Sequence, residues 1–275
     1  MDIYKGTVCI VTGAASGIGK ALVEELYRRG ARIIATDINV SGLQKALIPL
    51  IKNVAIEKLD VTDYDAFKKI VDDTVSREGR LDYIFNNAGI AVGGEIRDQS
   101  IDDWRKVLDV NLNGMLYGSV LAYKIMAKQG FGHIVNTSSL EGLVPFPETV
   151  SYVTSKFGVV GLSLGMRVEG ADLGVKVSVV CPGYIRTPIF ETTKLISLNR
   201  DKLLKFAGPP LSTFSMSAEQ CARVILKGVA CNKPIIVVTS IAKVIWWLAR
   251  ISPKFALILV RKSFARWRDK VRIVT

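Results

Sequence analysis

Two kinds of segment alternate along most of the chain: short apolar, often β-branched runs, and longer segments with apolar positions at helical spacing. The short runs lack polar alternation, which is typical of strands covered by helices on both faces of a sheet. We expect strands at 8–11, 32–36, 54–59, 83–85, 133–137, 176–180 and 234–238. We expect helices at 18–29, 64–77, 101–128, 151–173 and 218–230. This alternation predicts an α/β fold with a doubly wound parallel sheet.

The length of 275 residues suits one large domain with a full core and leaves little room for a second. We expect this domain at 1–240 and a separate C-terminal extension at 241–275, where the alternation stops. The segment 190–216 has no clear period and contains Gly208-Pro209-Pro210. Such a segment is typical of a lid over a site or of an ordinary surface excursion. The pattern leaves open whether it closes over a substrate.

Cysteine and histidine usage gives no sign of a disulfide framework or a metal site. Cys9, Cys181, Cys221 and Cys231 show no paired spacing, so we expect free, structural thiols. The single histidine, His133, has no partner ligand and is expected to be structural. The chain shows no basic leader followed by an apolar stretch, so a cytoplasmic location is expected.

A glycine-rich turn, Thr12-Gly13-Ala14-Ala15-Ser16-Gly17-Ile18-Gly19, joins the first expected strand to the first expected helix. Glycines let a pyrophosphate approach the backbone at a helix N-terminus, where free N–H groups favour anions. Asp37 ends the second strand about 20 residues later, where a carboxylate can accept hydrogen bonds from an adenosine ribose. Because this carboxylate would repel a 2′-phosphate, the sequence favours NAD over NADP.

A second group of residues suits proton transfer. Tyr152 and Lys156 are four residues apart in an expected helix and therefore share one face. An ammonium beside a phenol favours the phenolate, so we expect Lys156 to lower the pKa of Tyr152 toward the range of a general acid/base. Ser139 follows a strand, where its hydroxyl could hold a carbonyl or alcohol oxygen. Tyr-x-x-x-Lys alone is a common chance pattern, and its position behind a dinucleotide-binding turn makes it informative.

Six separated motifs occur in the order and spacing of the short-chain dehydrogenase/reductase family, which the chain resembles over roughly residues 5–240. They are Thr12–Gly19, Asp60, Asn86-Asn87-Ala88-Gly89, Asn111, the set Ser139/Tyr152/Lys156, and Pro182-Gly183-Tyr184-Ile185-Arg186-Thr187. The resemblance implies a Rossmann-like single domain, an NAD(H) cofactor and a homodimer or homotetramer. It implies the catalytic residues Asn111, Ser139, Tyr152 and Lys156.

The resemblance also implies roles for individual residues. Asn111 would support a water-linked proton relay to Lys156, which would also bond the nicotinamide ribose. Asp60 would contact the adenine, and Thr187 would hold the nicotinamide carboxamide. The full expected cofactor site comprises Gly13, Ser16, Gly17, Ile18, Gly19, Asp37, Asp60, Val61, Asn87, Ala88, Gly89, Tyr152, Lys156, Pro182, Gly183, Ile185 and Thr187.

Net charge is concentrated in the extension. The chain carries a net charge of +12, and residues 241–275 hold nine Lys/Arg against one Asp. Three of the four tryptophans also lie there, beside the apolar runs 241–248 and 255–260. Aromatic residues beside cations suit the headgroup region of an anionic membrane. We therefore expect an amphipathic helical extension in peripheral membrane contact; packing against the body or a partner subunit is the alternative.

Two other interpretations of the extension are disfavoured. A membrane-spanning helix would be interrupted by Lys243, Arg250, Pro253 and Lys254. Nucleic-acid binding would leave the many Leu, Ile and Trp side chains without a use.

The function expected from these features is NAD-dependent interconversion of an alcohol and a ketone or aldehyde. A membrane-facing extension favours a small lipophilic substrate of retinoid, steroid or long-chain type. Leu143, Val144, Phe146 and Phe190 are expected near the site, with 144–147 as a rigid loop that shapes the pocket. The alternatives are a 3-oxoacyl thioester reductase of fatty-acid metabolism, a non-catalytic NAD(H)-binding scaffold, and a membrane- or partner-docking module with incidental activity.

Overall fold

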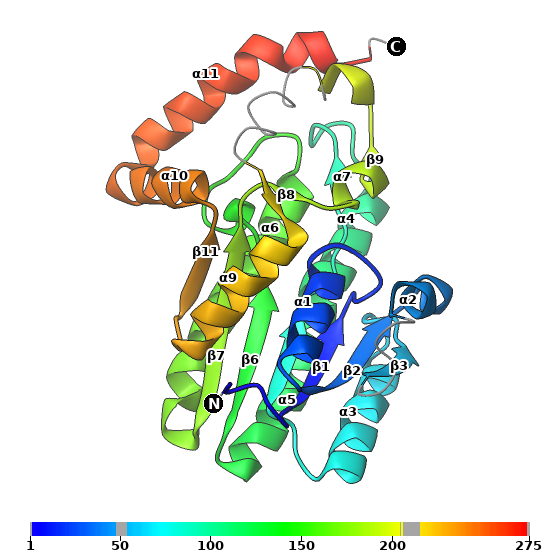
Figure 1. Ribbon diagram of the computed structural model, residues 1–275. Coiled ribbons are helices and arrows are strands. Elements are labelled where there is room, and N and C mark those ends of the chain that lie inside the picture. The colour runs from blue at the N-terminus through cyan, green and yellow to red at the C-terminus, as the bar shows by residue number, and fades with distance from the viewer. Residues whose placement is uncertain (1, 48–53, 204, 206–214, 274–275) are drawn as a thin grey trace.

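A seven-stranded parallel sheet lies at the centre of the molecule, with helices on both faces (Figure 1). The computed structural model describes residues 2–47, 54–203, 205 and 215–273. The strand order is β11-β7-β6-β4-β1-β2-β3. These strands are β1 Val8–Thr12, β2 Arg32–Asp37, β3 Val54–Lys58, β4 Tyr83–Asn86, β6 Gly132–Thr137, β7 Val175–Pro182 and β11 Ile235–Val238. The doubly wound α/β prediction and all seven predicted strands are confirmed.

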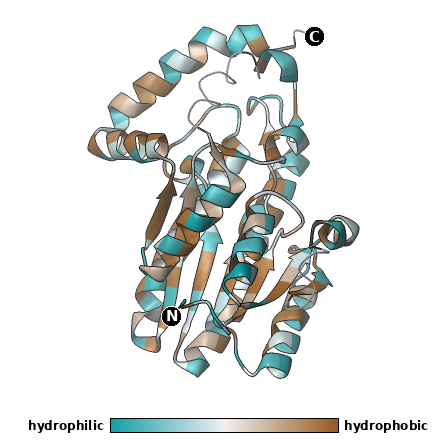
Figure 2. Cartoon of the chain, in the orientation of Figure 1, coloured by the Kyte–Doolittle hydropathy of each residue, from teal (hydrophilic) through white to brown (hydrophobic). Residues whose placement is uncertain are grey.

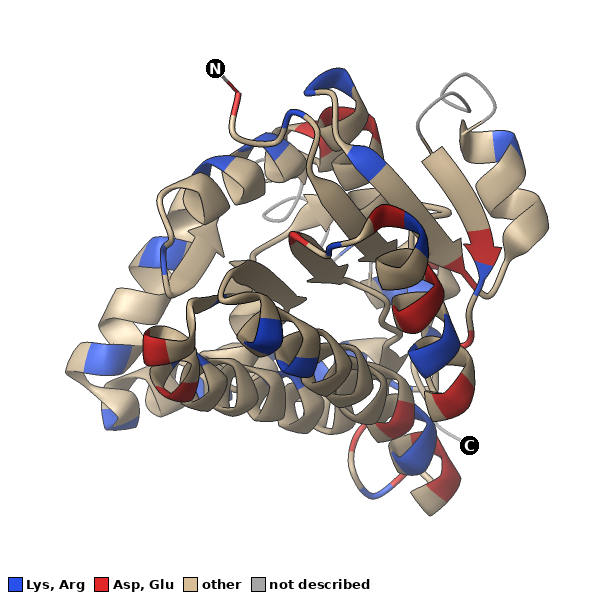
Figure 3. Ribbon diagram, turned by 90° about the horizontal axis from the view of Figure 1, so that it is seen from below, with Lys and Arg blue, Asp and Glu red and all other residues tan. Residues whose placement is uncertain are grey.

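Helices cover the sheet in two layers. One face carries α1 (Gly17–Arg28), α2 (Val40–Leu47) and α9 (Ala218–Ala230). The other carries α3 (Tyr64–Glu78), α5 (Gly114–Gln129) and α6 (Val150–Gly170). The strands are mostly free of charged residues, which gather on the surrounding helices and loops (Figure 3). This two-sided cover explains why the strands read as continuous apolar runs.

The predicted helix at 101–128 divides into three parts. It comprises α4 (Ile101–Leu108), a π-helical turn η2 (Asp109–Asn113) and α5. Helix α2 was not predicted. The other predicted helices are confirmed with small shifts of their ends, as in α6, which is followed by the 3-10 turn η4 (Ala171–Leu173).

Local sequence signals set several helix ends. Ser100 begins α4 with a capping box, in which its hydroxyl and the Asp103 carboxylate each accept a backbone N–H. Ser217 and Gln220 form the same arrangement at α9. Helix α3 ends at Gly79, whose φ of 73° is the left-handed conformation that glycine adopts without a steric penalty.

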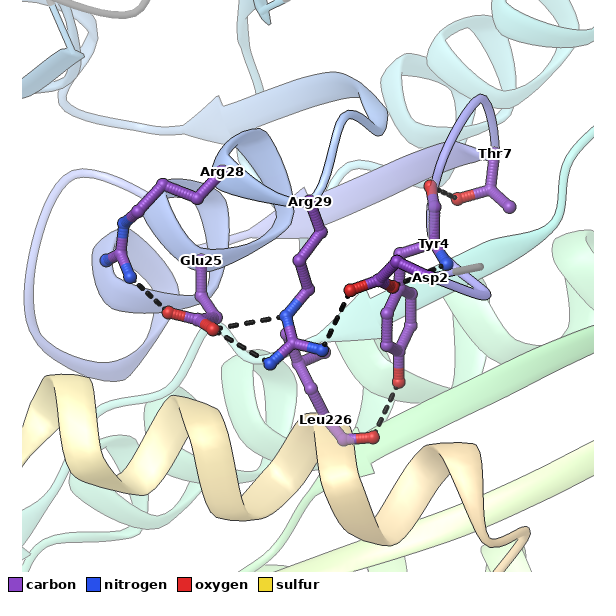
Figure 4. Close-up of polar contacts among 7 residues, drawn as sticks. All are labelled: Asp2, Tyr4, Thr7, Glu25, Arg28, Arg29 and Leu226. Atoms are coloured by element: carbon purple, nitrogen blue, oxygen red, sulfur yellow. Dashed lines mark hydrogen bonds and ion pairs between the residues drawn. The ribbon is translucent and has the colours of Figure 1, made fainter.

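The N-terminal segment is tied to helices α1 and α9 (Figure 4). The Tyr4 hydroxyl donates a hydrogen bond of 2.6 Å to the carbonyl oxygen of Leu226 in α9. Arg29, just after α1, pairs with Glu25 at 2.9 Å and with Asp2 at 3.3 Å. Because Tyr4 is buried in the core cluster beneath α1 and α9, its hydroxyl needs this partner.

The chain reverses its direction of winding between β1 and β4. These strands are neighbours, but β2 and β3 extend the sheet on the β1 side and β6, β7 and β11 extend it on the β4 side. In doubly wound sheets, the crevice at the carboxyl ends of two such strands is where ligands bind.

Short elements lie above this edge of the sheet. Strand β5 (Val92–Gly93) pairs with β9 (Lys194–Leu195), and β8 (Ile185–Arg186) pairs with β10 (Met216–Ser217). A short helix α7 (Ile189–Thr192) precedes β9. Part of the predicted lid segment 190–216 is therefore structured, whereas Gly208, Pro209 and Pro210 lie outside the described residues.

The extension forms two helices, α10 (Ser240–Ile251) and α11 (Pro253–Val271), and α11 crosses above the carboxyl edge of the sheet (Figure 1). Among the residues that the structure describes, no helix is long and apolar enough to cross a membrane. The C-terminal end of α11 is attached to the body. Arg268 donates two hydrogen bonds to the Glu95 carboxylate, at 2.9 and 2.6 Å, and Arg272 pairs with the same carboxylate at 2.7 Å. The Asn199 N–H donates to the Val271 carbonyl at 2.8 Å.

Candidate active site

The glycine-rich turn lies at the winding reversal between β1 and β4. Gly13 has a φ of +66°, and a Cβ at this position would lie 2.8 Å from the Ala88 Cα. A Cβ on Gly19 would lie 2.1 Å from the Gly13 carbonyl oxygen. Side chains at these positions would therefore collide with backbone. The turn thus brings the N-terminus of α1, with its free N–H groups, to the floor of the crevice, where an anionic group can bind.

Two predicted adenosine-side carboxylates line the same crevice. Asp37, at the end of β2, accepts hydrogen bonds from the Ala15 N–H at 3.0 Å and from the Asn39 N–H at 2.9 Å. Asp60 accepts from the Thr62 N–H at 2.9 Å and from its hydroxyl at 2.7 Å. Backbone and side-chain donors thus hold both carboxylates at fixed positions on the wall of the crevice.

The structure brings Ser139, Tyr152 and Lys156 together at the other end of the crevice. Ser139 begins the short 3-10 turn η3 (Leu140–Gly142), and its hydroxyl forms a hydrogen bond with the Tyr152 phenol. The Lys156 ammonium donates to the Thr137 carbonyl at 2.9 Å and lies 5.4 Å from the centre of the Tyr152 ring. Tyr152 and Lys156 lie one turn apart on α6, as their spacing predicts.

The prediction that Lys156 lowers the pKa of Tyr152 is wrong: the pKa of Tyr152 is raised. Burial raises the pKa of the Tyr152 phenol, and the nearby Glu141 carboxylate raises it further, while the Ser139 hydrogen bond lowers it. Burial also lowers the pKa of Lys156 to about 8. Desolvation is the largest contribution to both shifts, because burial disfavours the charged form of each group.

Asn111 lies in the π-helical turn η2 and is fully buried. Its side-chain amide donates to the Ile90 carbonyl at 2.9 Å and to the Ser155 hydroxyl at 3.1 Å, and its oxygen accepts from the Ile90 N–H at 2.8 Å. A Cβ on Gly89 would lie 3.2 Å from the Asn111 oxygen and 3.5 Å from the Lys156 nitrogen. Asn111 and Lys156 therefore flank Gly89, and the turn that interrupts the predicted helix is what places Asn111 there.

One cavity of about 1610 Å³ joins these groups. All of the predicted cofactor residues line it except Gly19, which lies behind the turn against Gly13. Of the predicted catalytic residues, Asn111 alone does not line it. Val144, Phe146 and Phe190 form part of the wall, as expected. Leu143 does not line the cavity; it packs against a core cluster that includes Leu140 and Val159.

A half-buried carboxylic acid in this wall was not predicted. Glu141 lies two residues after Ser139 and accepts a hydrogen bond of 2.6 Å from the Thr149 hydroxyl. Burial raises its pKa to about 7. Glu148, at a strained φ of 65°, also lines the cavity, and burial raises its pKa to about 7. The one sequence signal that could have placed Glu141 in the site is its position just after Ser138 and Ser139, where β6 ends.

The extension completes the cavity, which the sequence pattern did not predict. Side chains from one face of α11 and from α10 line its upper wall: Ile245, Leu248, Ala256, Leu259, Val260, Ser263, Phe264 and Trp267. All but Ser263 are apolar. The segments around α7 and β9 contribute Phe190, Leu195 and Leu198. The polar groups therefore lie at the carboxyl edge of the sheet and an apolar roof lies opposite.

The cysteines and the histidine have structural positions. Cys9, Cys181 and Cys221 are buried and free, and Cys231 is exposed and free. His133 is buried in β6, where its ring contacts the Ser178 hydroxyl at 2.8 Å, and burial lowers its pKa to about 3. It is therefore neutral, and its structural role is confirmed. Within the described ranges, no cluster of three His, Cys, Asp or Glu side chains could hold a metal ion.

Comparison with known proteins agrees with this geometry. The family model described as short chain dehydrogenase matches residues 7–195. The chain is 38% identical over 225 residues to a 3-oxoacyl-[acyl-carrier-protein] reductase of Thermotoga maritima, covering 81% of this chain and 89% of that one. It is 36% identical over 205 residues to a cyclohexanol dehydrogenase of Acinetobacter, covering 71% and 81%.

A solved structure is also similar. A short chain dehydrogenase/reductase from Burkholderia phymatum, in complex with NAD, superposes with a TM-score of 0.78 at 26% identity. The similarity covers 86% of this chain and 90% of that chain. With the fold, the glycine-rich turn and the Ser139, Tyr152 and Lys156 arrangement in place, the chain belongs to the short-chain dehydrogenase family and is an oxidoreductase of the alcohol/ketone type.

Proposed function

We propose that the protein interconverts a lipophilic alcohol and its ketone or aldehyde with NAD(H). One observation carries this proposal: a single cavity connects the Asp37 carboxylate, the Ser139/Tyr152/Lys156 set and an apolar roof. The first suits an adenosine ribose, the second a reacting oxygen, and the third an extended apolar substrate. The two relatives described above are named for a 3-oxoacyl thioester and for cyclohexanol, so both thioesters and simple alcohols fit the same chemistry.

The residues present fit a dinucleotide. Gly13 and Gly17 have positive φ values and leave room for a pyrophosphate at the N-terminus of α1, beside Ser16. Asp37 lines the crevice, and each of its carboxylate oxygens accepts one backbone N–H, which leaves further lone pairs for the hydroxyls of an unphosphorylated ribose. Since a 2′-phosphate there would face a carboxylate, we infer a preference for NAD over NADP.

In the proposed mechanism, Ser139 and Tyr152 hold the substrate oxygen by hydrogen bonds and Tyr152 exchanges the proton with it. When bound, NAD(H) would supply or accept the hydride, and the positive charge of its oxidised form would favour the Tyr152 phenolate. Lys156 acts beside the phenol and would bond the nicotinamide ribose. Asn111, held by Ile90 and Ser155, would position the proton path that ends at Lys156. Gly183, Ile185 and Thr187 would surround the nicotinamide, as the resemblance implies.

The other proposed features concern the whole protein. We treat residues 1–240 as the catalytic domain and 241–275 as an extension, with a homodimer or homotetramer as the working form. The protein would lie in the cytoplasm, with the extension in peripheral contact with a membrane surface that supplies a retinoid-, steroid- or long-chain-type substrate. The exposed Trp247 and the exposed Lys/Arg side chains of the extension support this position.

Absorbance at the reduced-nicotinamide band tests the proposal, with lipophilic alcohols and ketones screened against NAD and NADP in detergent or vesicles. NAD-dependent turnover that Tyr152→Phe abolishes, with cofactor binding retained, is the expected result. Turnover retained by Tyr152→Phe would refute the proton-transfer role. Absence of turnover with every alcohol and ketone, while NADH still binds, would favour the non-catalytic scaffold.

A second candidate is reduction of a 3-oxoacyl thioester, favoured by the similarity to the Thermotoga maritima reductase. A cofactor titration separates the two. Turnover of an acyl thioester with NADPH, together with weak NAD binding, would support the reductase.

A further inference from the structure

The junction of α10 and α11 presents an unusual surface. Eight of the nineteen exposed large apolar side chains among the described residues fall within positions 244–259. We define them as the elbow patch: Val244, Trp247, Leu248, Ile251, Phe255, Leu257, Ile258 and Leu259. Figure 2 shows this end of both helices as largely hydrophobic, in contrast to the hydrophilic C-terminal half of α11. So large an apolar concentration on an exposed helical hairpin marks an interaction surface.

The geometry of the hairpin keeps the patch exposed. Ser252 joins the helices and caps α11 by accepting the Phe255 N–H at 3.3 Å, and Pro253 occupies the first position of α11. The opposite sides of both helices are engaged: Ala242 is buried in the core cluster beside Ile245, and Val271 is buried at the attached end of α11. The side chain of Ile251, at the tip, is 77% exposed. The hairpin therefore has two fixed ends and a projecting apolar tip.

The charge around the tip indicates which kind of surface the elbow patch binds. Six exposed cationic residues alternate with the elbow patch or follow it along α10 and α11, and we call them the cationic rim: Lys243, Arg250, Lys254, Arg261, Lys262 and Arg266. No Asp or Glu occurs between residues 241 and 268. In the part of the chain that the structure describes, no acidic side chain forms a salt bridge with the rim. A second copy of this surface would be repelled by its like charge, whereas an anionic lipid headgroup layer complements the rim and an acyl layer accepts the patch.

The elbow patch also borders the active-site cavity. Leu248 and Leu259 belong to the elbow patch and also line the cavity, so the patch and the cavity wall are continuous at these two side chains. Val260, Phe264 and Trp267, farther along α11, line the same cavity as Tyr152.

We propose that the elbow patch inserts into an anionic lipid surface and that lipophilic substrate passes from the lipid into the cavity between α10 and α11. The passage of substrate rests on the proposed function, whereas the insertion does not.

Co-sedimentation of the full-length protein with vesicles tests the insertion. Binding is compared for neutral phosphatidylcholine vesicles and for vesicles that also contain phosphatidylglycerol, at low and high salt. We expect binding to the anionic vesicles that high salt weakens. Ile251→Asp should reduce this binding by roughly tenfold or more, since it places a charge in the acyl layer. Val168→Asp, at a 78% exposed position on α6, is the matched control and should bind as the unaltered protein does.

A charge-reversed variant gives a second test that leaves the apolar residues in place. Lys254→Glu combined with Lys262→Glu should weaken binding by about fivefold or more per lysine at the anionic surface. Equal binding to neutral and anionic vesicles, or unchanged binding by both variants, would overturn the proposal. Loss of a dimer in Ile251→Asp by sedimentation, without vesicle binding by the unaltered protein, would assign the patch to an interface between copies.

The passage of substrate is tested by turnover of two ketones, one long-chain and carried in vesicles, the other short and soluble. Ile251 does not line the cavity, so Ile251→Asp should lower kcat/KM for the vesicle-borne ketone alone. Equal loss for both ketones would refute a lipid-side opening. If neither ketone is reduced by the unaltered protein while vesicle binding persists, the proposed function fails and the insertion stands.

Discussion

Glu141 offers a quantitative test of the active-site electrostatics. Burial raises the pKa of this carboxyl group from 4.5 to about 7. The unfolded chain therefore ionises first as the pH rises from 4.5, and the folded state binds more protons between pH 4.5 and 7. Stability falls across this interval, and above pH 7 the full penalty is present. The Glu141→Gln variant cannot ionise, and its amide oxygen can still accept the Thr149 hydrogen bond.

The size of the penalty follows from the pKa. At about 1.4 kcal/mol per pH unit, the rise corresponds to a penalty on the order of 3 kcal/mol; because water reaches the half-buried carboxyl group, we expect about 1–3 kcal/mol. For a chain of 275 residues, this is a rise in Tm of about 2–5 °C for Glu141→Gln at pH 8. At pH 4.5 the two proteins should differ little.

Thermal unfolding of both proteins at several pH values between 4.5 and 9 measures this difference. Glu169→Gln, at an exposed position on α6, is the control and should change the stability by less than about 0.5 kcal/mol. A Tm difference that is constant with pH, or a less stable Glu141→Gln at pH 8, would refute the reasoning. Because the Glu141 carboxylate raises the pKa of Tyr152, the variant should also shift the pH profile of alcohol oxidation to lower pH.

Three further predictions follow from other contacts. Asp37→Ala should weaken the binding of NAD more than that of NADP in a fluorescence titration. An unchanged affinity for NAD would exclude the contact between Asp37 and the ribose. Gly13→Ala should reduce NAD affinity about tenfold or more, since the new Cβ would lie 2.8 Å from the Ala88 Cα; wild-type binding would show that the turn adapts. The pKa of Glu95 is lowered to about 2 by its hydrogen bonds with Arg268 and Arg272, so its stabilisation is present above pH 4.5 and lost toward pH 2. Glu95→Gln should therefore lower the free energy of unfolding by about 1–3 kcal/mol at pH 7 and leave it nearly unchanged at pH 2, as measured by urea denaturation.

The fold was predictable because its signals are local. Each strand of the sheet is covered on both faces, so each appears as a continuous apolar run between helical segments. The glycine-rich turn, Asp37 and the Tyr152–Lys156 spacing are likewise readable, since each depends on neighbours within a few residues. Helix α2 escaped prediction because it has only eight residues, two of them buried, and contains Gly42, which weakens the helical signal.

The features that the sequence could not predict depend on contacts between residues far apart in the chain. The π-helical turn that places Asn111 beside Lys156 follows from contacts with Ile90 and Ser155, 21 and 44 residues away. The direction of the Tyr152 pKa depends on burial, which the spacing of Tyr152 and Lys156 does not express.

The sequence by itself determined the layered sheet and the order of the motifs, because periodicity and turn chemistry are encoded within each segment. The reaction class followed from those motifs and from the family resemblance that they carry. It also located the basic, tryptophan-rich extension. Only the tertiary structure decided that α10 and α11 roof the cavity and that Glu95, far along the chain, holds the end of α11. The physical reason is that burial and desolvation are set by what folds over a residue, and the residues that do so here lie up to 173 positions away.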